Sequence, residues 1–487
     1  EWRTDYRRRH CDVLVIGGGV AGLSAAIAAA REGADVVLVD EDVEPGGQLL
    51  WQGKHEQARK LAEEARAAGV EIMSSAPALG YFDGMVPVWQ GSTLHQIRAQ
   101  RHVAATGSIE QPLVFPNNDL PGVMLTTGAL KLAALYALKP GENAVIATTG
   151  ERGLEAALAL QAAGVNVIAV ADLLPNRSNE LTAAVEAAGI QLMRGMTVVE
   201  ARGNKHLKGC TLAQIDENGV AKPGTEERFD CDLLAVSGGT VPASSLMLQA
   251  GAKAKFNSEA NCFLPENPPP GIHPAGAVAG KEELEAAALS GTLAGARAAQ
   301  ECEFGDGSAA TAAANALEAL PTPAPAAPSP AYQRTAKPTG KAFLDLDEDV
   351  TTKDMKYAIE EGYDSIELSK RYTTVTMGPS QGRVSQLPSI RAVAAQTGLS
   401  IDETGITTAR PPWSTVPLGA WAGRPFTPAK RSAIHARQRE LGSHVKWAGD
   451  WRRAYDYGDV KGEAAAVHQA VGMIDVSTLG KMIVSGP

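Results

Sequence analysis

"CDVLVIGGGVAGLSAAIAAAREGADVVLVDE", residues 11–41, decides the fold of this chain. It opens with a β-branched strand, passes through a glycine turn into an alanine-rich helix, and ends in a second strand followed by acids. Gly17 permits the tight turn, Gly19 lets a pyrophosphate approach the backbone, and Gly22 lets helix and strand pack closely. The stretch therefore predicts a βαβ dinucleotide-binding unit, with the phosphate charge at the helix N-terminus.

An acid ends the second strand of this unit. Asp40 follows Gly22 at about the 20-residue spacing at which a carboxylate accepts hydrogen bonds from ribose hydroxyls. This acid favours NAD over NADP, because it would repel a 2′-phosphate. We expect the same pocket to include the loop "EPGGQL" with Gly46, Gly47 and Gln48, the backbone of Ala78 near the adenine, and the strand end at Thr106 and Gly107.

A second unit follows in "NAVIATTGERGLEAALALQAAGVNVIAVAD", residues 143–172, with Asp172 as its terminal acid. Its glycine turn is damaged, because Thr148 stands where the first glycine is expected while Gly150 and Gly153 remain. We favour a retained fold with an empty or weak pocket over a second working nucleotide site.

The chain then returns to the first unit through "CDLLAVSGGTVPA" and "GIHPAGAVAGKEELEAAALSG". This nested order resembles the α/β fold with two dinucleotide-binding Rossmann domains of the glutathione reductase type. Flavin-binding members of that fold have an acid in the late glycine motif, whereas this chain has Gly276 and Ala277. Without that carboxylate, and without a CxxC dithiol, NAD is a better occupant of the first pocket than FAD.

Composition limits the kinds of partner. A net charge of −10 provides no basic field for nucleic acid, and the five cysteines form no CxxC pair. The arginines near the start, followed by an apolar run, resemble a secretory signal, but the glycine turn argues against it. No apolar run reaches the roughly 18 residues of a membrane span, so we expect a cytoplasmic protein. The chain starts without Met and stops in mid-pattern, which indicates a fragment of a longer protein.

The stretch "DLDEDVT", residues 345–351, has three interpretations. A calcium loop would need Gly at its sixth place and Glu at its twelfth, where this chain has Val350 and Lys356. The start of a helix is better supported, because Thr351 and Asp354 have the spacing of a capping box.

The third interpretation comes from a resemblance to small ferredoxin-like domains related to bacterioferritin-associated ferredoxin. Matching "EDVT" and "QGR" to that domain places Asp345, Asp347, Ser380 and Ser385 at its four cysteine positions. Since an iron-sulfur cluster needs strong ligands, normally thiolates, the resemblance implies a module without a cluster or other metal.

Taken together, the nested fold, the "AGA" motif, this module and the later "TARPPWSTVPLGAWAGRPFTPAKRS" resemble the family of α subunits of heterotetrameric sarcosine oxidases. "WRRAYDYGD" and "VGMIDVSTLGKMIVSGP" resemble the start of the GcvT-like α+β aminomethyltransferase domain that ends those subunits. The resemblance implies that an N-terminal ferredoxin-like segment and most of the folate-binding domain are missing here.

Five parts of the chain are therefore expected. They are a first, NAD-binding domain at 10–114 plus 230–302, an inserted dinucleotide-type domain at 115–229, an extended Ala/Pro-rich linker at 303–340, the small helical module at 341–405, and a connector with the start of the aminomethyltransferase domain at 406–487.

The resemblance further implies an oxidoreductase acting on CH–NH donors, which demethylates sarcosine to glycine and forms peroxide from O₂. It implies FAD in a β subunit, FMN at the interface with that subunit, tetrahydrofolate in the missing domain, and two small subunits. The sequence itself shows no nucleophile with its base, so we assign no catalytic residue to this chain. The NAD contacts that it places here are Ala21, Asp40, Glu41, Asp42, Gln48, Ala78, Ala277, Glu282 and Leu284. The alternatives are the large subunit of an N-methylglutamate or opine-type dehydrogenase, and a stand-alone NAD(P)H-dependent FAD oxidoreductase.

Overall fold

The computed structural model describes residues 4–322, 328–408, 410–422 and 429–480. The chain divides into two compact units, residues 1–416 and 417–487. The first unit contains both dinucleotide-type domains and the helical module, and the second contains the C-terminal segment.

The first domain is built on a mainly parallel sheet with the strand order β18-β5-β1-β2-β3, and β4 adds antiparallel to β5. All of β2 is buried, as expected of a valine-rich strand covered on both faces. Because β1 and β2 are parallel neighbours, the glycine turn after β1 and the acid after β2 lie at the same edge. The strands are β1 (Asp5–Ile16), β2 (Val36–Val39), β3 (Glu71–Met73), β4 (Met85–Gln90), β5 (Thr93–Ala104) and β18 (Ile272–Pro274).

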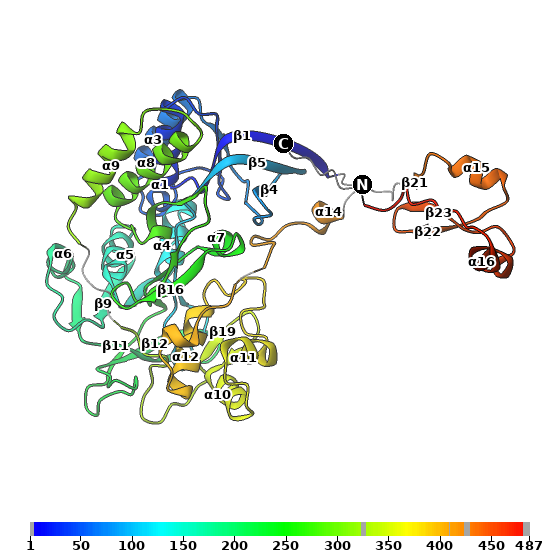
Figure 1. Ribbon diagram of the computed structural model, residues 1–487. Helices are drawn as coiled ribbons and strands as arrows, with labels where there is room; N and C mark the ends of the chain where they lie inside the picture. The colour runs from blue at the N-terminus through cyan, green and yellow to red at the C-terminus, as the bar shows by residue number, and fades with distance from the viewer. Residues whose placement is uncertain (1–3, 323–327, 409, 423–428, 481–487) are drawn as a thin grey trace. The chain divides into compact units, whose positions relative to one another are not determined.

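Small residues let the helices of this domain approach closely. A side chain at Gly291 or Gly295 of α8 would collide with the backbone of α1 at Ala21 or Ala25. Figure 1 shows these helices grouped beside the sheet, with α9 against α8. The helices are α1 (Val20–Arg31), α2 (Gln48–Trp51), α3 (His55–Ala67), α8 (Leu284–Glu301) and α9 (Ser308–Glu318), and the single turn η1 (Gly276–Ala279) precedes α8.

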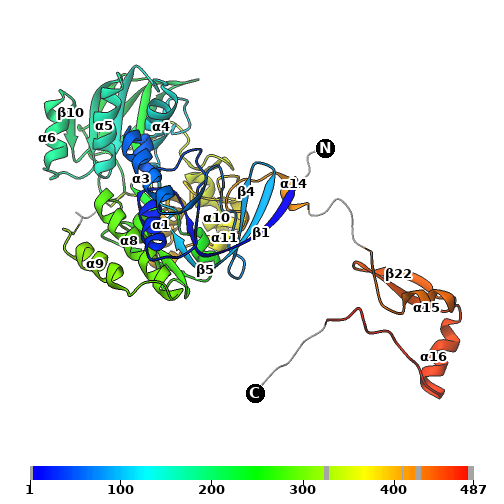
Figure 2. The same ribbon diagram turned by 90° about the horizontal axis from the view of Figure 1, so that it is seen from above.

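The second domain has a parallel sheet with the order β10-β9-β8-β14-β7. Figure 2 shows α4, α5 and α6 grouped together around this sheet. Together, the two dinucleotide-type sheets confirm the predicted α/β fold class. The elements are β7 (Val123–Leu125), α4 (Thr126–Tyr136), β8 (Asn143–Thr148), α5 (Glu151–Ala162), β9 (Asn166–Asp172), α6 (Glu180–Ala187), β10 (Gln191–Arg194) and β14 (Leu233–Ser237).

The position of β14 corrects one predicted boundary. The sequence placed residues 230–302 in the first domain, but β14 pairs between β8 and β7 in the second sheet. The return to the first domain therefore comes after Ser237. Strand order depends on long-range pairing, which the local sequence of β14 does not encode.

Shorter elements connect the two domains. β6 (Ser108–Glu110), on the way to the second domain, pairs antiparallel with β15 (Thr240–Pro242), on the way back to the first. The remaining short elements do not connect the domains. β11 (Thr197–Gly203), β12 (Leu207–Ala213) and β13 (Glu227–Phe229) form an antiparallel sheet, and along the chain they follow β10 and precede β14 of the second domain. The helix α7 (Ser245–Gln249) and the hairpin of β16 (Lys253–Asn257) and β17 (Cys262–Glu266) lie between β15 and β18 along the chain.

The predicted linker at 303–340 is not extended throughout. Residues 308–318 form α9, in which Ala310 and Ala313 are buried. Alanine has the highest helix propensity of any residue, and contact with α8 stabilises the segment. The Ala-rich composition was wrongly interpreted as unstructured chain.

The module after the linker is mostly helical. It consists of β19 (Phe343–Asp345), β20 (Val350–Thr351), α10 (Thr352–Glu360), α11 (Ile366–Thr373), α12 (Gln386–Thr397) and α13 (Ile401–Thr404). Thr351 and Asp354 form the capping box of α10, which confirms the predicted helix start.

Within its described residues, the second unit contains a small sheet, β21-β23-β22, and three helices. Its elements are α14 (Leu418–Trp421), β21 (Lys430–Arg431), α15 (His435–Glu440), β22 (His444–Ala448), β23 (Trp451–Asp456) and α16 (Val460–Gln469). Residues 481–487, the end of the stretch assigned to the aminomethyltransferase domain, lie outside the described residues.

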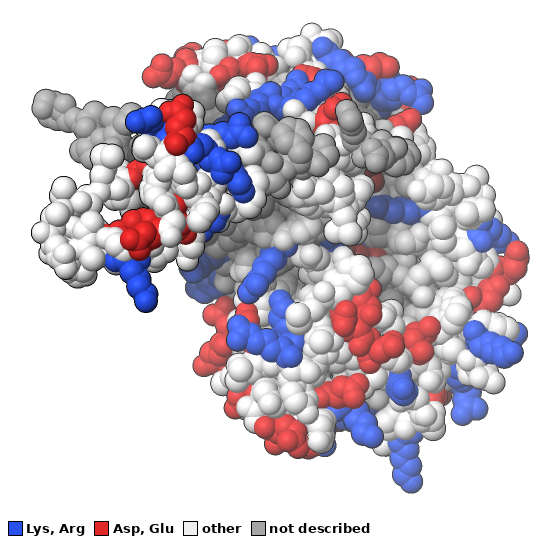
Figure 3. Space-filling model, turned by 90° about the vertical axis from the view of Figure 1, so that its right-hand side faces the viewer, with Lys and Arg blue, Asp and Glu red and all other residues white. Residues whose placement is uncertain are grey.

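The charged side chains and the helices bear on the partners that the composition argued against. On the face in Figure 3, Lys and Arg side chains lie among Asp and Glu side chains rather than in one continuous basic surface. Within the described residues, no helix is both long enough and apolar enough to cross a membrane.

Candidate nucleotide-binding site

The glycine turn after β1 has the geometry of a phosphate cradle. Gly17 has φ +106°, and a side chain there would collide with the carbonyl of Ala105. A side chain at Gly22 would collide with the carbonyl of Gly17, so packing requires both glycines. Gly19 differs, because a Cβ there would have Gly47 Cα, at 3.9 Å, as its nearest neighbour. The turn is closed on its protein side and leaves room above Gly19.

Helix α1 begins at this turn without a side-chain cap. Its N-cap is Gly19, and its first turn contains no acid. The loop with Gly46 and Gly47 lies over the turn, and the Gly46 amide donates to the Gly18 carbonyl at 2.8 Å. Uncapped first-turn amides and the positive end of the helix dipole favour a bound anion.

Asp40 is buried beside the turn. Its carboxylate accepts hydrogen bonds from the backbone amides of Gly18 and, at 2.7 Å, of Asp42. Burial raises the pKa of Asp40 to about 6, against the opposing effect of these two amides. Each carboxylate oxygen can accept more than one hydrogen bond, so a ribose hydroxyl can still be bound.

The other residues predicted at this end of the site lie close together. Glu41 and Asp42 are exposed, and Ala78 is buried. Backbone bonds hold the two segments side by side, because Ala76 N donates to Asp40 O at 2.7 Å and Ser75 N donates to Asp42 O at 2.8 Å. The strand end at 40–42 and the loop at 75–80 therefore form one edge.

Glu282 lies at a junction between the two domains. Its carboxylate accepts hydrogen bonds from Thr240 Oγ1 at 2.5 Å and from the Arg152 guanidinium at 3.2 Å, and its carbonyl accepts from Gln48 Nε2 at 3.3 Å. Arg152 also lies 5.5 Å from the ring centre of Trp51. The predicted contacts Gln48 and Glu282 thus meet, whereas no motif in the sequence pointed to Arg152 or Thr240.

The remaining predicted contacts border the turn or support it. Thr106 Oγ1 donates to Ala243 O at 2.7 Å, and Gly107 O accepts from Ala243 N at 3.0 Å. Gly276 has φ +70° and lies against Ala21, which brings the turn containing Ala277 to α1. Leu284 packs with Val20, Leu49, Leu50 and Ala58.

The corresponding pocket of the second domain is filled by its own side chains. Asp172 is fully buried and accepts from Arg177 Nε at 2.7 Å. The same guanidinium donates to Thr149 O, in the glycine turn, at 3.2 Å. Thr148 Oγ1 donates to Gly150 O at 2.8 Å. The acid that would bind a ribose is thus paired internally, which favours the predicted retained fold with an empty or weak nucleotide pocket.

In the helical module, carboxylates hold the loop that follows α11. Asp345 is buried and accepts hydrogen bonds from the backbone amides of Thr376 at 2.7 Å and Asp347 at 2.9 Å. Asp347 accepts from the Ser380 amide at 2.8 Å. Within the described residues, no group of three His, Cys, Asp or Glu side chains could hold a metal ion. Asp345 and Asp347 of "DLDEDVT" thus accept hydrogen bonds from backbone amides, and Glu348 accepts one from the Thr374 hydroxyl at 2.8 Å.

We expect Asp345→Asn to destabilise the protein by about 1–3 kcal/mol. In the variant, an NH₂ group replaces one of the two carboxylate oxygens of this buried side chain, so one backbone amide loses its acceptor. Thermal unfolding measures this loss. Asp349→Asn is the matched control, because Asp349 is exposed with φ +54° and asparagine tolerates that conformation. Equal unfolding temperatures for the two variants would contradict the role given to Asp345.

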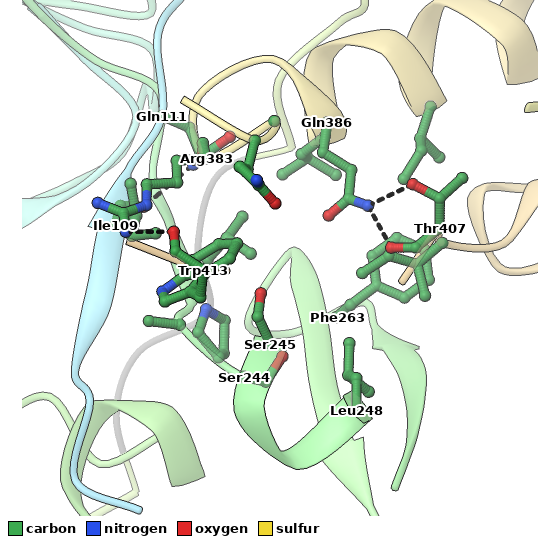
Figure 4. A pocket seen from close by; sticks show the side chains of 18 residues that line it. Ile109, Gln111, Ser244, Ser245, Leu248, Phe263, Arg383, Gln386, Thr407 and Trp413 are labelled. Atoms are coloured by element: carbon green, nitrogen blue, oxygen red, sulfur yellow. Dashed lines mark hydrogen bonds between the residues drawn. The ribbon is translucent and has the colours of Figure 1, made fainter. Parts of the chain in front are cut away.

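A cavity lies where the module meets the first domain (Figure 4). Its volume is about 30 Å³, far below the roughly 300–1,000 Å³ of small-molecule sites. The cavity is too small for a dinucleotide.

Comparison with known proteins adds the family. The model of the pyridine nucleotide-disulphide oxidoreductases matches residues 11–299, and that of the sarcosine oxidase A3 domain matches residues 339–424. The chain is 33% identical to the sarcosine oxidase α subunit of Corynebacterium sp. strain P-1, over 99% of this chain and 54% of that subunit. It is 32% identical to the α subunit of Rhizobium meliloti strain 1021, over 98% of this chain and 50% of that subunit.

The chain thus spans about half the length of these curated relatives. Among solved structures, L-proline dehydrogenase from P. horikoshii has a similar fold, with a TM-score of 0.68 at 23% identity, over 86% of this chain and 81% of that one.

Proposed function

The chain belongs to the pyridine nucleotide-disulphide oxidoreductase family and is related to sarcosine oxidase α subunits, and from this premise we propose that it is the NAD⁺-binding part of such a subunit. The observation that carries the proposal is the uncapped glycine turn after β1 with Asp40 buried beside it. The residues that would hold NAD⁺ are those of the turn, the 40–42 edge and the loop at 75–80.

A structural role for NAD⁺ fits this chain better than hydride transfer. Glu282 joins the two domains through Arg152 and Thr240, and the second pocket is filled by Arg177. Within the described residues no CxxC dithiol is present, and all five cysteines are buried and free. When bound, NAD⁺ would hold the glycine turn and the Gly47 loop together through its pyrophosphate, and the 40–42 edge through its ribose hydroxyls.

The complex proposed around this subunit is a heterotetramer that oxidatively demethylates sarcosine. A β subunit would contribute FAD and the amine-oxidising site, and FMN would lie where the two subunits meet. The proposed complex also contains two small subunits. It would use O₂ as the electron acceptor and bind tetrahydrofolate in a further domain. The cellular location proposed is the cytoplasm. An N-methylglutamate or opine-type substrate is the alternative, and the assembled complex with each amine would decide between them.

The test of the proposal is the nucleotide that the purified protein retains, and how pH changes its affinity. We expect about one NAD⁺ per chain after denaturation and chromatography. Since the pKa of Asp40 is about 6, the carboxylate that accepts ribose hydroxyls is lost as pH falls through 6. Titration calorimetry should give about tenfold weaker NAD⁺ binding at pH 5 than at pH 7.5.

Asp40→Asn should bind NAD⁺ weakly at both pH values, without the pH dependence. The stability of the wild type should respond to pH in the opposite sense to its NAD⁺ affinity. Because the folded pKa of Asp40 lies above the ordinary 3.8, this carboxyl stabilises the fold at low pH, and that stability is lost as pH rises through 6. Asp40→Asn should lack this pH response. Purified protein with stoichiometric FAD that oxidises NADH alone would instead establish the stand-alone oxidoreductase.

A further inference from the structure

Residues 411–414, Pro-Pro-Trp-Ser, lie against the adenosine edge of the site, and we call them the strap. Trp413 N donates to Leu79 O at 2.6 Å, in the loop at 75–80. A Cβ at Gly80 would come within 2.9 Å of Pro411 Cβ, so the proline lies directly on that glycine. The strap is more than 300 residues away in sequence and still contacts this loop along its backbone.

The strap also reaches the acids after β2. Ser414 is buried, and its hydroxyl donates to Glu41 Oε2 at 3.3 Å. The Trp413 side chain packs on the buried cluster that includes Ala76, Ala78 and Val88. The contacts of the strap therefore fall on the same two segments, 40–42 and 75–80, that form the adenosine end of a Rossmann site.

Arg383, in the "QGR" motif of the module, fixes the strap in place. Its guanidinium donates to Trp413 O at 3.1 Å and to Ser414 Oγ at 3.3 Å, and lies 4.6 Å from the Trp413 ring centre. Its own carbonyl accepts from Gln111 Nε2 at 2.9 Å. Figure 4 shows Arg383, Trp413 and Gln111 together at one side of the small cavity. The planar guanidinium makes a stacking contact and two hydrogen bonds, which an ammonium cannot reproduce.

We propose that the strap completes the adenosine end of the dinucleotide site, and that Arg383 lets the helical module set how tightly the nucleotide is held. This inference rests on the proposed function. Ser414 orients Glu41, whose carboxylate can then accept from a ribose hydroxyl, and Trp413 holds the backbone beside Ala78. Trp413, Ser414 and Arg383 are positioning residues, and the ligand class is the adenosine monophosphate part of a dinucleotide.

The test uses the full-length protein with Ser414→Ala, Arg383→Met or Arg383→Lys, and two probes, NAD⁺ and AMP. We expect Ser414→Ala to weaken both probes between about two- and tenfold, as for one lost hydrogen bond. Arg383→Met should weaken both by about tenfold, and Arg383→Lys should restore little of this loss. Ser414→Thr, which keeps the hydroxyl, should restore affinity. Titration calorimetry measures each affinity, and thermal unfolding reports stability.

Arg334→Met is the matched control. Arg334 lies 4.9 Å from the Tyr332 ring centre and donates to the carbonyls of Asn218 and Tyr332, but contacts neither edge of the site. It should lose stability without losing affinity for AMP. Wild-type protein that binds neither NAD⁺ nor AMP would contradict the proposed function itself. Wild-type binding of both probes, with unchanged affinities in the strap variants, would overturn this inference alone.

Discussion

Gly19→Ala should weaken NAD⁺ binding on the order of a hundredfold, about 2.8 kcal/mol, while the protein stays folded. Gly19 has φ −72°, which alanine adopts freely, and the added methyl group would meet only Gly47 Cα at 3.9 Å. The methyl group would instead occupy the space through which a pyrophosphate approaches the first turn of α1. The loss in stability should be at most about 1 kcal/mol, because alanine is a poorer N-cap than glycine.

Gly22→Ala is the control variant for Gly19→Ala, because it should lose stability as well as NAD⁺ binding. A methyl group there collides with the carbonyl of Gly17, so the strand and helix must separate. We expect about 1–3 kcal/mol of destabilisation together with loss of NAD⁺. Thermal unfolding and titration calorimetry on both variants separate the two effects. Wild-type NAD⁺ affinity in Gly19→Ala would mean that the nucleotide does not approach this turn.

The sequence predicted the parts of the site that depend on local backbone geometry. Gly17 and Gly22 were assigned from their spacing, and the structure gives each the steric reason that the assignment assumed. Asp40 was likewise located by its distance from the turn, and it lies buried beside that turn. Local motifs predict local geometry, because the turn and its flanking elements must fit one another whatever the rest of the chain does.

Contacts between distant segments could not be predicted in this way. The Ser414 hydroxyl donates to Glu41, which is 373 residues away in sequence, and Arg152 donates to Glu282 at the junction between the two domains. Nothing near Ser414 or Arg152 marks them as neighbours of the proposed site, because their partners are set by how whole domains pack. The placement of β14 failed for the same reason, since its neighbours in the sheet are far away in sequence.

Aspartate in the acidic stretch at 345–351 could serve as a helix cap, as a ligand or as an acceptor for backbone amides. Asp345 and Asp347 were assigned to a helix start or to emptied ligand positions, and the structure shows them accepting backbone amides of the 376–380 loop. A sequence can exclude thiolate ligands at these positions. It cannot say which donors a carboxylate will meet, because those donors come from a loop about thirty residues away.

Arg177→Met should destabilise the protein by about 3–5 kcal/mol, the largest stability effect that we expect from removing a single charge in this chain. Arg177 is buried and pairs with Asp172, which is fully buried, so the substitution leaves a charged carboxylate without its cation. Thermal unfolding measures the loss. In the double variant Arg177→Met/Asp172→Asn the charge is gone, and most of the stability should return.

Lys139→Met in the same domain is the control, because its pair with Glu142 is exposed and should contribute less than about 1 kcal/mol. NAD⁺ affinity should be unchanged in every variant that remains folded, since the second pocket is occupied by Arg177 rather than by a nucleotide. A second equivalent of NAD⁺ bound by the wild type would contradict this assignment of the second domain, in which Asp172 is fully buried and paired with Arg177.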